Sequence, residues 1–303
     1  MITGDTLRTM ARDESIHAIG WFAATDFSAY LETIESSPAY HVIKYRPVEA
    51  FRAAGHIPSD IRTVVVLVMD YYVESSEGRD GYRLSNYARA CWTTVPPKTQ
   101  RVVEWLRAQG CLARAVDLPM RAAACRAGLG FIGRNTVFYA HGLGSYVGIA
   151  AIGTDAMIDG ASIMPERVVH PRCETCRACI KACPVGAIAD EGYRIDPRRC
   201  LSFINRHAEE PHGVMPDEPG RLQDWLFGCE SCQNVCPINA AAMHRHEVIV
   251  PPTICVEGMT LPNTATISRE TLENSKSAIR SPHYHAYIER LLAQPASSRS
   301  HLA

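Results

Sequence analysis

The sequence predicts an α+β fold, in which an α/β sheet domain comes first and a small cysteine-rich module follows it. Several short apolar runs typical of buried strands lie in the first 165 residues, with helical patterns between them. Residues 173–237 hold eight of the twelve cysteines. The chain has 303 residues, of which 47% are hydrophobic, and this is enough for one sizeable core and a smaller module.

We therefore expect three parts: residues 1–165 as the α/β domain, 166–240 as the cysteine-rich module and 241–303 as a C-terminal extension. The net charge of −1 argues against binding nucleic acid through bulk charge. The N-terminal twenty residues carry scattered charges, and no apolar run approaches the roughly 18–20 residues of a membrane span. We expect a cytoplasmic protein without a membrane partner.

The N-terminal elements follow from hydrophobic patterning. Residues 5–17 are polar with spaced apolar positions, which predicts a surface helix, and 18–24 then predict a buried strand. Residues 27–58 show no strong period and are expected to form helix and loop. Residues 64–69 are almost wholly apolar and mostly valine, so they predict a central strand covered on both faces.

The later elements are read in the same way. Apolar residues at helical spacing predict a helix over 99–110, after the Pro96-Pro97 pair and before a glycine stop signal. Strands are expected at 112–116 and 145–153, and a short helix at 285–293.

The cysteines of the module have a specific spacing. They are Cys173-x2-Cys176-x2-Cys179-x3-Cys183-Pro184, then Cys200, then Cys229-x2-Cys232-x3-Cys236-Pro237. The first run is the bacterial ferredoxin spacing, in which the fourth cysteine ligates the neighbouring cluster. The spacing predicts a ferredoxin-like module with two [4Fe-4S] clusters.

The ligand sets follow from the same rule. Cysteines three residues apart on a tight loop can bind three corners of a cube, whereas the fourth corner needs a cysteine from another direction. The predicted sets are Cys173, Cys176, Cys179 and Cys236 for one cluster, and Cys183, Cys200, Cys229 and Cys232 for the other.

The cysteines have two other interpretations, a zinc site and a disulfide framework. A zinc site uses four ligands and leaves half of these thiols unexplained. A disulfide framework suits small secreted chains, and this chain has neither property. The remaining cysteines show no mutual spacing, and each is expected to be a small buried side chain: Cys91, Cys111, Cys125 and Cys255.

A glycine-rich segment, AGLGFIGRNT at 127–136, is the other notable motif. Its glycines let the backbone approach a ligand or another backbone closely, and its arginine can meet a phosphate or carboxylate. It fails as a dinucleotide fingerprint, which would start a helix directly after a strand, and by itself it favours a structural turn. The candidate cofactor-binding residues here are Gly128, Gly130, Gly133, Arg134, Asn135 and Thr136.

Taken together, these pieces resemble the epoxyqueuosine reductase family over residues 57–240. The resemblance is carried by IPSDIRTVV at 57–65, Val116-Asp117-x-Pro119, the glycine-rich segment, Gly144-Ser145 and the two cysteine runs. It implies an N-terminal domain that binds cobalamin, in a fold akin to the B12-processing chaperone and flavin nitroreductases. It also implies that the two clusters deliver electrons to the cobalt. Asp117 falls where the family has its proton-donating aspartate, a role that requires burial to raise the carboxyl pKa.

The chain also departs from the family. Trp92, Thr93 and Thr94 stand where the family has an Asp-Tyr-His triplet, and the segment between Asp117 and Ala127 is shorter. The family's C-terminal helical repeats, which help to grip tRNA, have no counterpart in this short tail. These departures indicate a divergent, C-terminally short member and argue against tRNA as the substrate.

The sequence therefore predicts an iron–sulfur oxidoreductase that passes electrons to a bound corrinoid. The expected partners are an electron donor such as ferredoxin or flavodoxin, and a small molecule or a corrinoid carried by another protein as substrate. Three alternatives stay open. The chain could be a ferredoxin-like electron-transfer partner without corrinoid, a true epoxyqueuosine reductase acting on tRNA, or a protein whose clusters are only structural.

Overall fold

The computed structural model describes residues 2–35, 56–73, 81–205, 222, 224–242, 248 and 250–294. The expectation of helix and loop over 36–55 lies outside these residues. The chain divides into two compact units that interleave in sequence. The first unit comprises Met1–Tyr71, Cys91–Thr175 and Ala241–His246, and the second comprises Tyr72–Ala90, Cys176–Ala240 and Glu247–Ala303. The predicted domains are consecutive segments instead, and their boundaries stay predictions.

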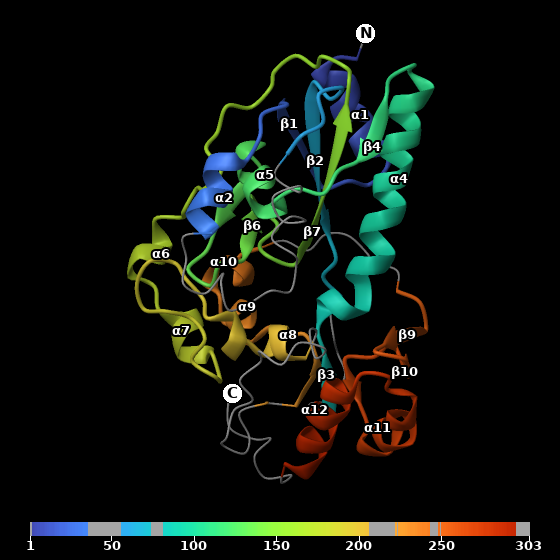
Figure 1. Ribbon diagram of the computed structural model, residues 1–303, viewed down its shortest axis with the longest axis vertical. Coiled ribbons are helices and arrows are strands. Elements are labelled where there is room, and N and C mark those ends of the chain that lie inside the picture. Colours follow the sequence, from blue (N-terminus) through green and yellow to red (C-terminus); the bar gives the residue numbers. More distant parts are fainter. Residues whose placement is uncertain are drawn as a thin grey trace. The chain divides into compact units, whose positions relative to one another are not determined.

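The first unit is built on a four-stranded antiparallel sheet (Figure 1). In spatial order its strands are β1 (Ala18–Ala23), β2 (Thr63–Asp70), β7 (Val147–Thr154) and β4 (Ala113–Ala115). All of β2 is buried, and its side chains alternate between two hydrophobic clusters, with Val66 in one and Leu67 in the other. The predicted central strand, covered on both faces, is confirmed.

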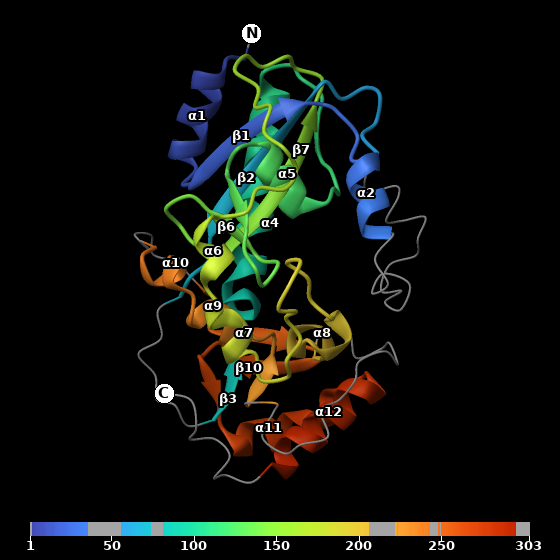
Figure 2. The same cartoon turned by 90° about the vertical axis from the view of Figure 1, so that its left-hand side faces the viewer.

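Helices cover both faces of this sheet. The helices on the two faces are α1 (Gly4–Asp13), α2 (Ser28–Glu35), α4 (Trp92–Ala108) and α5 (Met120–Arg126). Figure 2 shows these helices around the sheet. Leu7 of α1 and Val102 of α4 belong to the same hydrophobic cluster as Leu67, whereas Leu31 of α2 and Ala123 of α5 belong to that of Val66. The sheet pairs are all antiparallel, so the α+β class holds and the finer α/β description of this domain is not confirmed.

The start of α4 differs from the prediction. The predicted helix begins at residue 99 after the two prolines, but α4 begins at Trp92 and contains Pro96 and Pro97. A π-helical turn, Tyr87–Cys91, leads directly into it. Proline's fixed φ is compatible with a helix, so the two prolines lie inside α4 at the cost of two N–H donors.

The second unit includes a three-stranded sheet, a hairpin and, near the C-terminus, the helices α11 and α12. These elements are β11 (Thr266–Ile267), β3 (Tyr82–Leu84) and β8 (Trp225–Phe227) in the sheet, the hairpin of β9 (Thr253–Val256) and β10 (Met259–Pro262), and helices α11 (Arg269–Ser275) and α12 (Pro282–Ala293). Ser281 caps α12, and the helix begins three residues before its predicted start. The hairpin and α11 were not predicted. Tyr284 donates to the carbonyl of Leu226, which joins α12 to β8.

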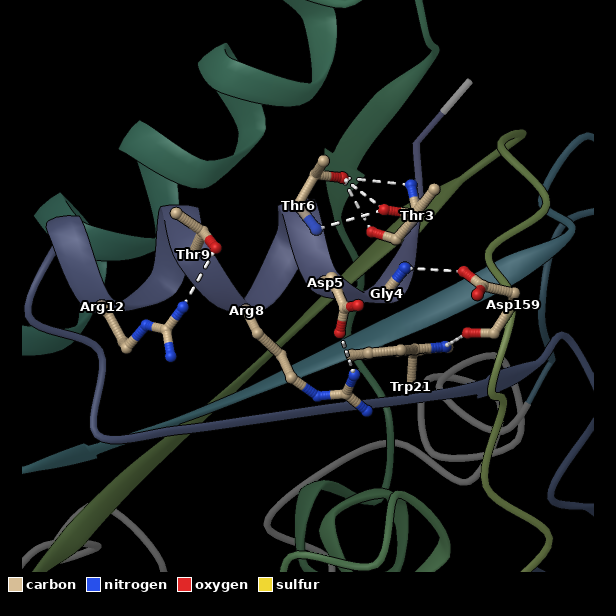
Figure 3. Close-up of polar contacts among 9 residues, drawn as sticks. All are labelled: Thr3, Gly4, Asp5, Thr6, Arg8, Thr9, Arg12, Trp21 and Asp159. Carbon is tan, nitrogen blue, oxygen red and sulfur yellow. Dashed lines mark hydrogen bonds and ion pairs between the residues drawn. The ribbon is translucent and has the colours of Figure 1, made fainter.

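A cap from a distant loop anchors α1 (Figure 3). The carboxylate of Asp159 accepts a hydrogen bond from the Gly4 N–H at 2.6 Å, and its backbone carbonyl accepts the Trp21 indole N–H at 2.8 Å. Thr3 and Thr6 complete a capping box at the same end. Because a helix N-terminus has unpaired N–H groups and a positive dipole end, this carboxylate stabilises α1 on β1.

Replacing Asp159 with alanine should lower the free energy of unfolding by about 1 kcal/mol, because Gly4 loses its acceptor while Trp21 keeps its own. Denaturant unfolding of the variant measures this. Asp13→Ala, an exposed change at the other end of α1, is the control and should stay within about 0.5 kcal/mol of the parent. Equal losses in the two variants would show that the Asp159 cap contributes nothing.

The four cysteines outside the motif do not share one environment. Cys91 and Cys125 are buried, as predicted, but Cys111 is half-buried and Cys255 is exposed. The prediction was wrong for Cys255, because it lies in β9 of the unpredicted two-stranded hairpin, where alternate side chains face solvent.

Candidate metal centre

Three cysteines of the second predicted ligand set gather on the core of the second unit. Cys183 ends α7 (Ala178–Ala182), Cys200 precedes α8 (Leu201–Ile204), and Cys229 follows β8. All three pack against the hydrophobic cluster that contains Leu201, Leu226 and Tyr287. Three segments of the chain thus bring three half-buried thiols to one hydrophobic cluster. Thiolates beside apolar side chains are suitable ligands for an iron–sulfur cluster.

The electrostatics of Cys229 indicate how costly its charge is without metal. Burial, together with the nearby Cys200 and Cys183, raises the pKa of the Cys229 thiol to about 12, although hydrogen bonding with Ser231 opposes the shift. A ligating sulfur must be deprotonated, so metal binding here must release protons.

Local hydrogen bonds involve two of these sulfurs. The Ala187 N–H donates to the Cys183 sulfur at 3.2 Å, and the Cys229 thiol donates to the Ser231 hydroxyl at 3.5 Å. Gly186 has φ of +59°, a conformation that lets the chain turn back so that the next N–H faces the sulfur. Hydrogen bonds to ligand sulfur are one of the levers by which a protein sets a cluster's reduction potential.

Buried polar residues fix the loop that carries Cys229. The Asn205 side chain donates to the Gly228 carbonyl and accepts from its N–H, both at 2.9 Å. Gly228 has φ of +74°, and a Cβ there would lie 2.2 Å from the Ser85 hydroxyl, so only glycine fits. Reciprocal bonds of this kind mimic a strand pair and hold the backbone just before the ligand.

Glu230, inside the Cys229-x2-Cys232 pair, ties the same loop to a second segment. Its carboxylate accepts the Asn86 amide N–H at 3.0 Å and the Tyr87 backbone N–H at 3.3 Å. Glu230 is only 3% exposed. Burial raises the pKa of this carboxyl, and the Asn86 and Tyr87 hydrogen bonds oppose the shift.

Glu230→Ala should lower the free energy of unfolding by about 2 kcal/mol, because it removes a buried acceptor and leaves two half-buried donors, on Asn86 and Tyr87, without it. Anaerobic denaturant unfolding of the reconstituted protein measures the loss. The matched control is Glu191→Ala, an exposed change in the same unit, which should have almost no effect. An unfolding midpoint for Glu230→Ala equal to that of the control would contradict the role of this carboxylate.

The first predicted ligand set is spread over both units. Cys173 lies in the four-residue helix α6 (Arg172–Thr175) of the first unit and is buried. Cys176, Cys179 and Cys236 belong to the second unit and are half-buried. Cys179 is in α7, and Cys236 lies between α9 (Ser231–Asn234) and α10 (Pro237–Ala240). The helices α7 and α9 pack against each other, as expected for two related half-motifs.

The glycine-rich segment forms the hairpin of β5 (Gly130–Ile132) and β6 (Phe138–Ala140) and the turn between them. Gly130 and Gly133 let the chain lie close to Tyr139: a Cβ would come within 2.0 Å of its carbonyl oxygen and 2.5 Å of its ring, respectively. Gly128 and Thr136 have φ of +74° and +62°. A structural turn is therefore what this segment forms.

The polar side chains of the segment are engaged within the protein. Asn135 donates to the Tyr139 hydroxyl at 3.0 Å. Arg134 donates to the backbone carbonyls of Cys173 and Glu174. These contacts hold the chain around Cys173, and binding of a corrinoid by this segment stays a prediction.

Asp117, the candidate acid, follows β4 and is exposed. The described residues of its own unit therefore do not supply the burial that its predicted role requires.

Sequence reasoning missed Glu230 and Asn205 as residues that support the ligands, and it singled out Arg134 for a different role, cofactor binding. Glu230 taken alone resembles a solvated polar residue, so its buried contact could not be predicted. Asn205 and Arg134 act on backbone atoms 23 and 39 residues away, a relation that no spacing pattern reveals.

The geometry differs from that of a mononuclear site. Within the described ranges, no group of three or more His, Cys, Asp or Glu side chains converges on a single ion position. Among the helices that the structure describes, none is long and apolar enough to cross a membrane.

Comparison with known proteins agrees with this site. Residues 172–239 match a family model described as a 4Fe-4S double cluster binding domain, which spans all eight motif cysteines. An epoxyqueuosine reductase of Cellulophaga algicola is 27% identical over 235 residues, 74% of each chain. One of Leadbetterella byssophila is 28% identical over 200 residues, 63% of each chain. One of Bacillus subtilis is 33% identical over 159 residues, or 52% of this chain and 39% of that protein. The chain thus spans less than two thirds of the length of two of these three relatives.

Solved structures share the fold. A crystal structure of an epoxyqueuosine reductase with an epoxyqueuosine-modified tRNA-Tyr stem loop superposes with a TM-score of 0.68 at 20% identity, over 95% of this chain and 79% of that one. The enzyme from Streptococcus thermophilus gives a TM-score of 0.66 at 18% identity, with the same coverage. The resemblance to the epoxyqueuosine reductase family is confirmed, and the chain is an iron–sulfur protein with a double [4Fe-4S] domain.

Proposed function

We propose that this relative of the epoxyqueuosine reductases is a reductase that passes electrons through two [4Fe-4S] clusters to a bound corrinoid, which reduces a substrate not yet identified. One observation supports the proposal above the others: Cys183, Cys200 and Cys229 come from three segments to one buried wall, as the predicted ligand set requires. The other proposed ligands are Cys232 for the same cluster and Cys173, Cys176, Cys179 and Cys236 for its neighbour.

When bound, clusters of this type accept and release single electrons at potentials that the protein sets. The chain's own residues position the ligand cysteines and place apolar side chains against three of them. Asn205 and Glu230 fix the loop of Cys229, and the core around Leu226 excludes water from its sulfur. The proposed electron donor is a ferredoxin or flavodoxin.

The corrinoid part of the proposal rests on the family resemblance. The glycine-rich segment stays the proposed corrinoid-binding segment, with Gly128, Gly130, Gly133, Arg134, Asn135 and Thr136 as the candidate residues. Asp117 stays the proposed proton donor, since its exposed position after β4 leaves it accessible to a substrate. A ligand that covers Asp117 would supply the burial that its acid role needs.

Titration of the anaerobically reconstituted protein with cob(II)alamin, followed by EPR, tests the corrinoid part. Stoichiometric binding with a changed cobalt signal supports it, and Asp117→Asn should then slow turnover without changing cofactor content. An unchanged cobalt signal in a protein with both clusters would instead favour a ferredoxin-like electron carrier that serves a protein partner.

Reduction of a modified tRNA base is the second candidate. It is favoured by the likeness over 95% of the chain to an enzyme solved with an epoxyqueuosine-modified tRNA stem loop. It predicts an affinity for that stem loop that falls steeply with salt. The sequence argues the other way at Trp92, Thr93 and Thr94, which replace the family's triplet. Retention of the stem loop at physiological salt, and loss of its epoxide with added reductant, would decide for tRNA.

A further inference from the structure

A buried arginine grips the backbone of the first cysteine loop. Arg134 is 5% exposed, and its Nε and Nη2 donate to the Cys173 carbonyl at 2.9 and 2.6 Å. The same Nη2 also donates to the Glu174 carbonyl at 3.1 Å. All three residues belong to the first unit. Hydrogen bonds from a guanidinium are charge-assisted, and a fork on one carbonyl fixes orientation as well as distance.

Arg134 is itself held rigidly in the turn between β5 and β6. The Gly133 N–H donates to the Val137 carbonyl and the Thr136 N–H to the Gly133 carbonyl, both at 2.9 Å. Arg121 donates to the Thr136 carbonyl. A side chain on a turn braced in this way transmits its position to whatever it bonds.

The same hairpin contacts the chain immediately before Cys173. Ile132 forms a bridge with Val169, and its N–H donates to the Val168 carbonyl at 2.7 Å. The Phe131 ring lies 4.7 Å from the His170 ring, between centroids. The hairpin therefore contacts residues 168–170 before the cysteine, and its Arg134 side chain contacts the backbone of Cys173 and Glu174.

The need for a cation follows from the local backbone. Cys173 and Glu174 lie in a helix of only four residues, too short to satisfy its last carbonyls internally. A cation is the favoured partner at that end of a helical turn. The guanidinium is buried and bonds the backbone of Cys173, whose sulfur is a proposed ligand.

We propose that Arg134 is the positioning residue of the Cys173 cluster: its fork fixes Cys173 for ligation, and its charge raises the reduction potential of that cluster. The charge acts in this direction because one-electron reduction makes a cluster more negative, and a fixed nearby cation stabilises the reduced form. The inference rests on the proposed double-cluster function and deepens it.

The test compares Arg134→Gln and Arg134→Lys with Arg126→Gln after anaerobic reconstitution. Arg126 is a matched control, since it is 8% exposed, lies in the same unit and also donates to backbone carbonyls, those of Thr25 and Asp26. Iron per chain and the midpoint potentials of the bound clusters are measured. Arg134→Gln should lose about half of the iron, and the Arg126 variant should keep all of it. Arg134→Lys should keep both clusters and the parent potential, because the charge is retained, but should release iron to a chelator faster.

The proposal is overturned if Arg134→Gln matches the parent in both iron content and potentials, or if Arg126→Gln loses as much iron. Should Arg134→Gln prove insoluble, the lysine variant decides: a chelator release rate equal to that of Arg126→Lys contradicts the positioning role. A parent protein that fails to take up about eight irons would instead refute the double-cluster function.

Discussion

Cys229→Ser should halve the iron content of the reconstituted protein, from about eight to about four atoms per chain, because it removes a ligand of one [4Fe-4S] cluster and leaves the other set intact. Cys229 is the most informative ligand to change, since its sulfur lies beside Cys200 and Cys183 on the core of the second unit. Iron and acid-labile sulfide assays on the anaerobically purified variant measure the loss.

The control for this experiment is Cys255→Ser. Cys255 is exposed in β9 and lies outside both predicted ligand sets, so its variant should keep all of the iron. A Cys229→Ser protein with the parent's iron content, or a Cys255→Ser protein with half of it, would show that the ligand assignment is wrong.

Gly130→Ala should lower the free energy of unfolding by about 3 kcal/mol or more, because the added methyl would meet the Tyr139 carbonyl oxygen at 2.0 Å and the Phe138 ring at 2.7 Å. Neither neighbour can move easily, since a backbone oxygen of the paired strand is one of them and both residues are buried. Denaturant unfolding with the clusters intact measures the cost.

Gly142→Ala provides the matched control, because Gly142 follows β6 in the same region and has open space around its Cβ position. Its φ of +75° makes alanine strained there, which should cost only about 1 kcal/mol. If the two variants unfold at the same denaturant concentration, close packing against Tyr139 is not what fixes Gly130.

The parts of the fold that the sequence predicts well are those in which local pattern and burial agree. The valine-rich run of β2 could only be a covered strand, and the cysteine spacing by itself restricts the ligand chemistry to iron–sulfur clusters. By contrast, Pro96 and Pro97 predicted that the helix begins after them, whereas α4 begins at Trp92, directly after a π turn. The proline signal is local and carries no information about the turn that precedes it.

The supporting residues of the site were harder to predict for a different reason. The sequence predicts that Arg134 binds a phosphate or carboxylate, since it follows a run of glycines. The structure shows it donating to two backbone carbonyls, 39 and 40 residues away. A backbone carbonyl is present at every residue, so the sequence does not indicate which one accepts a hydrogen bond. The pair of Glu230 and Asn86 cannot be predicted either, because each residue alone resembles a solvated polar group.

The central claim is that the eight motif thiols hold two [4Fe-4S] clusters, and the most direct test is chemical analysis of the anaerobically reconstituted protein. We expect about eight irons and about eight acid-labile sulfides per chain, together with an EPR signal that develops on reduction. A protein that instead holds one or two zinc ions, with no labile sulfide and no reducible signal, would contradict the account.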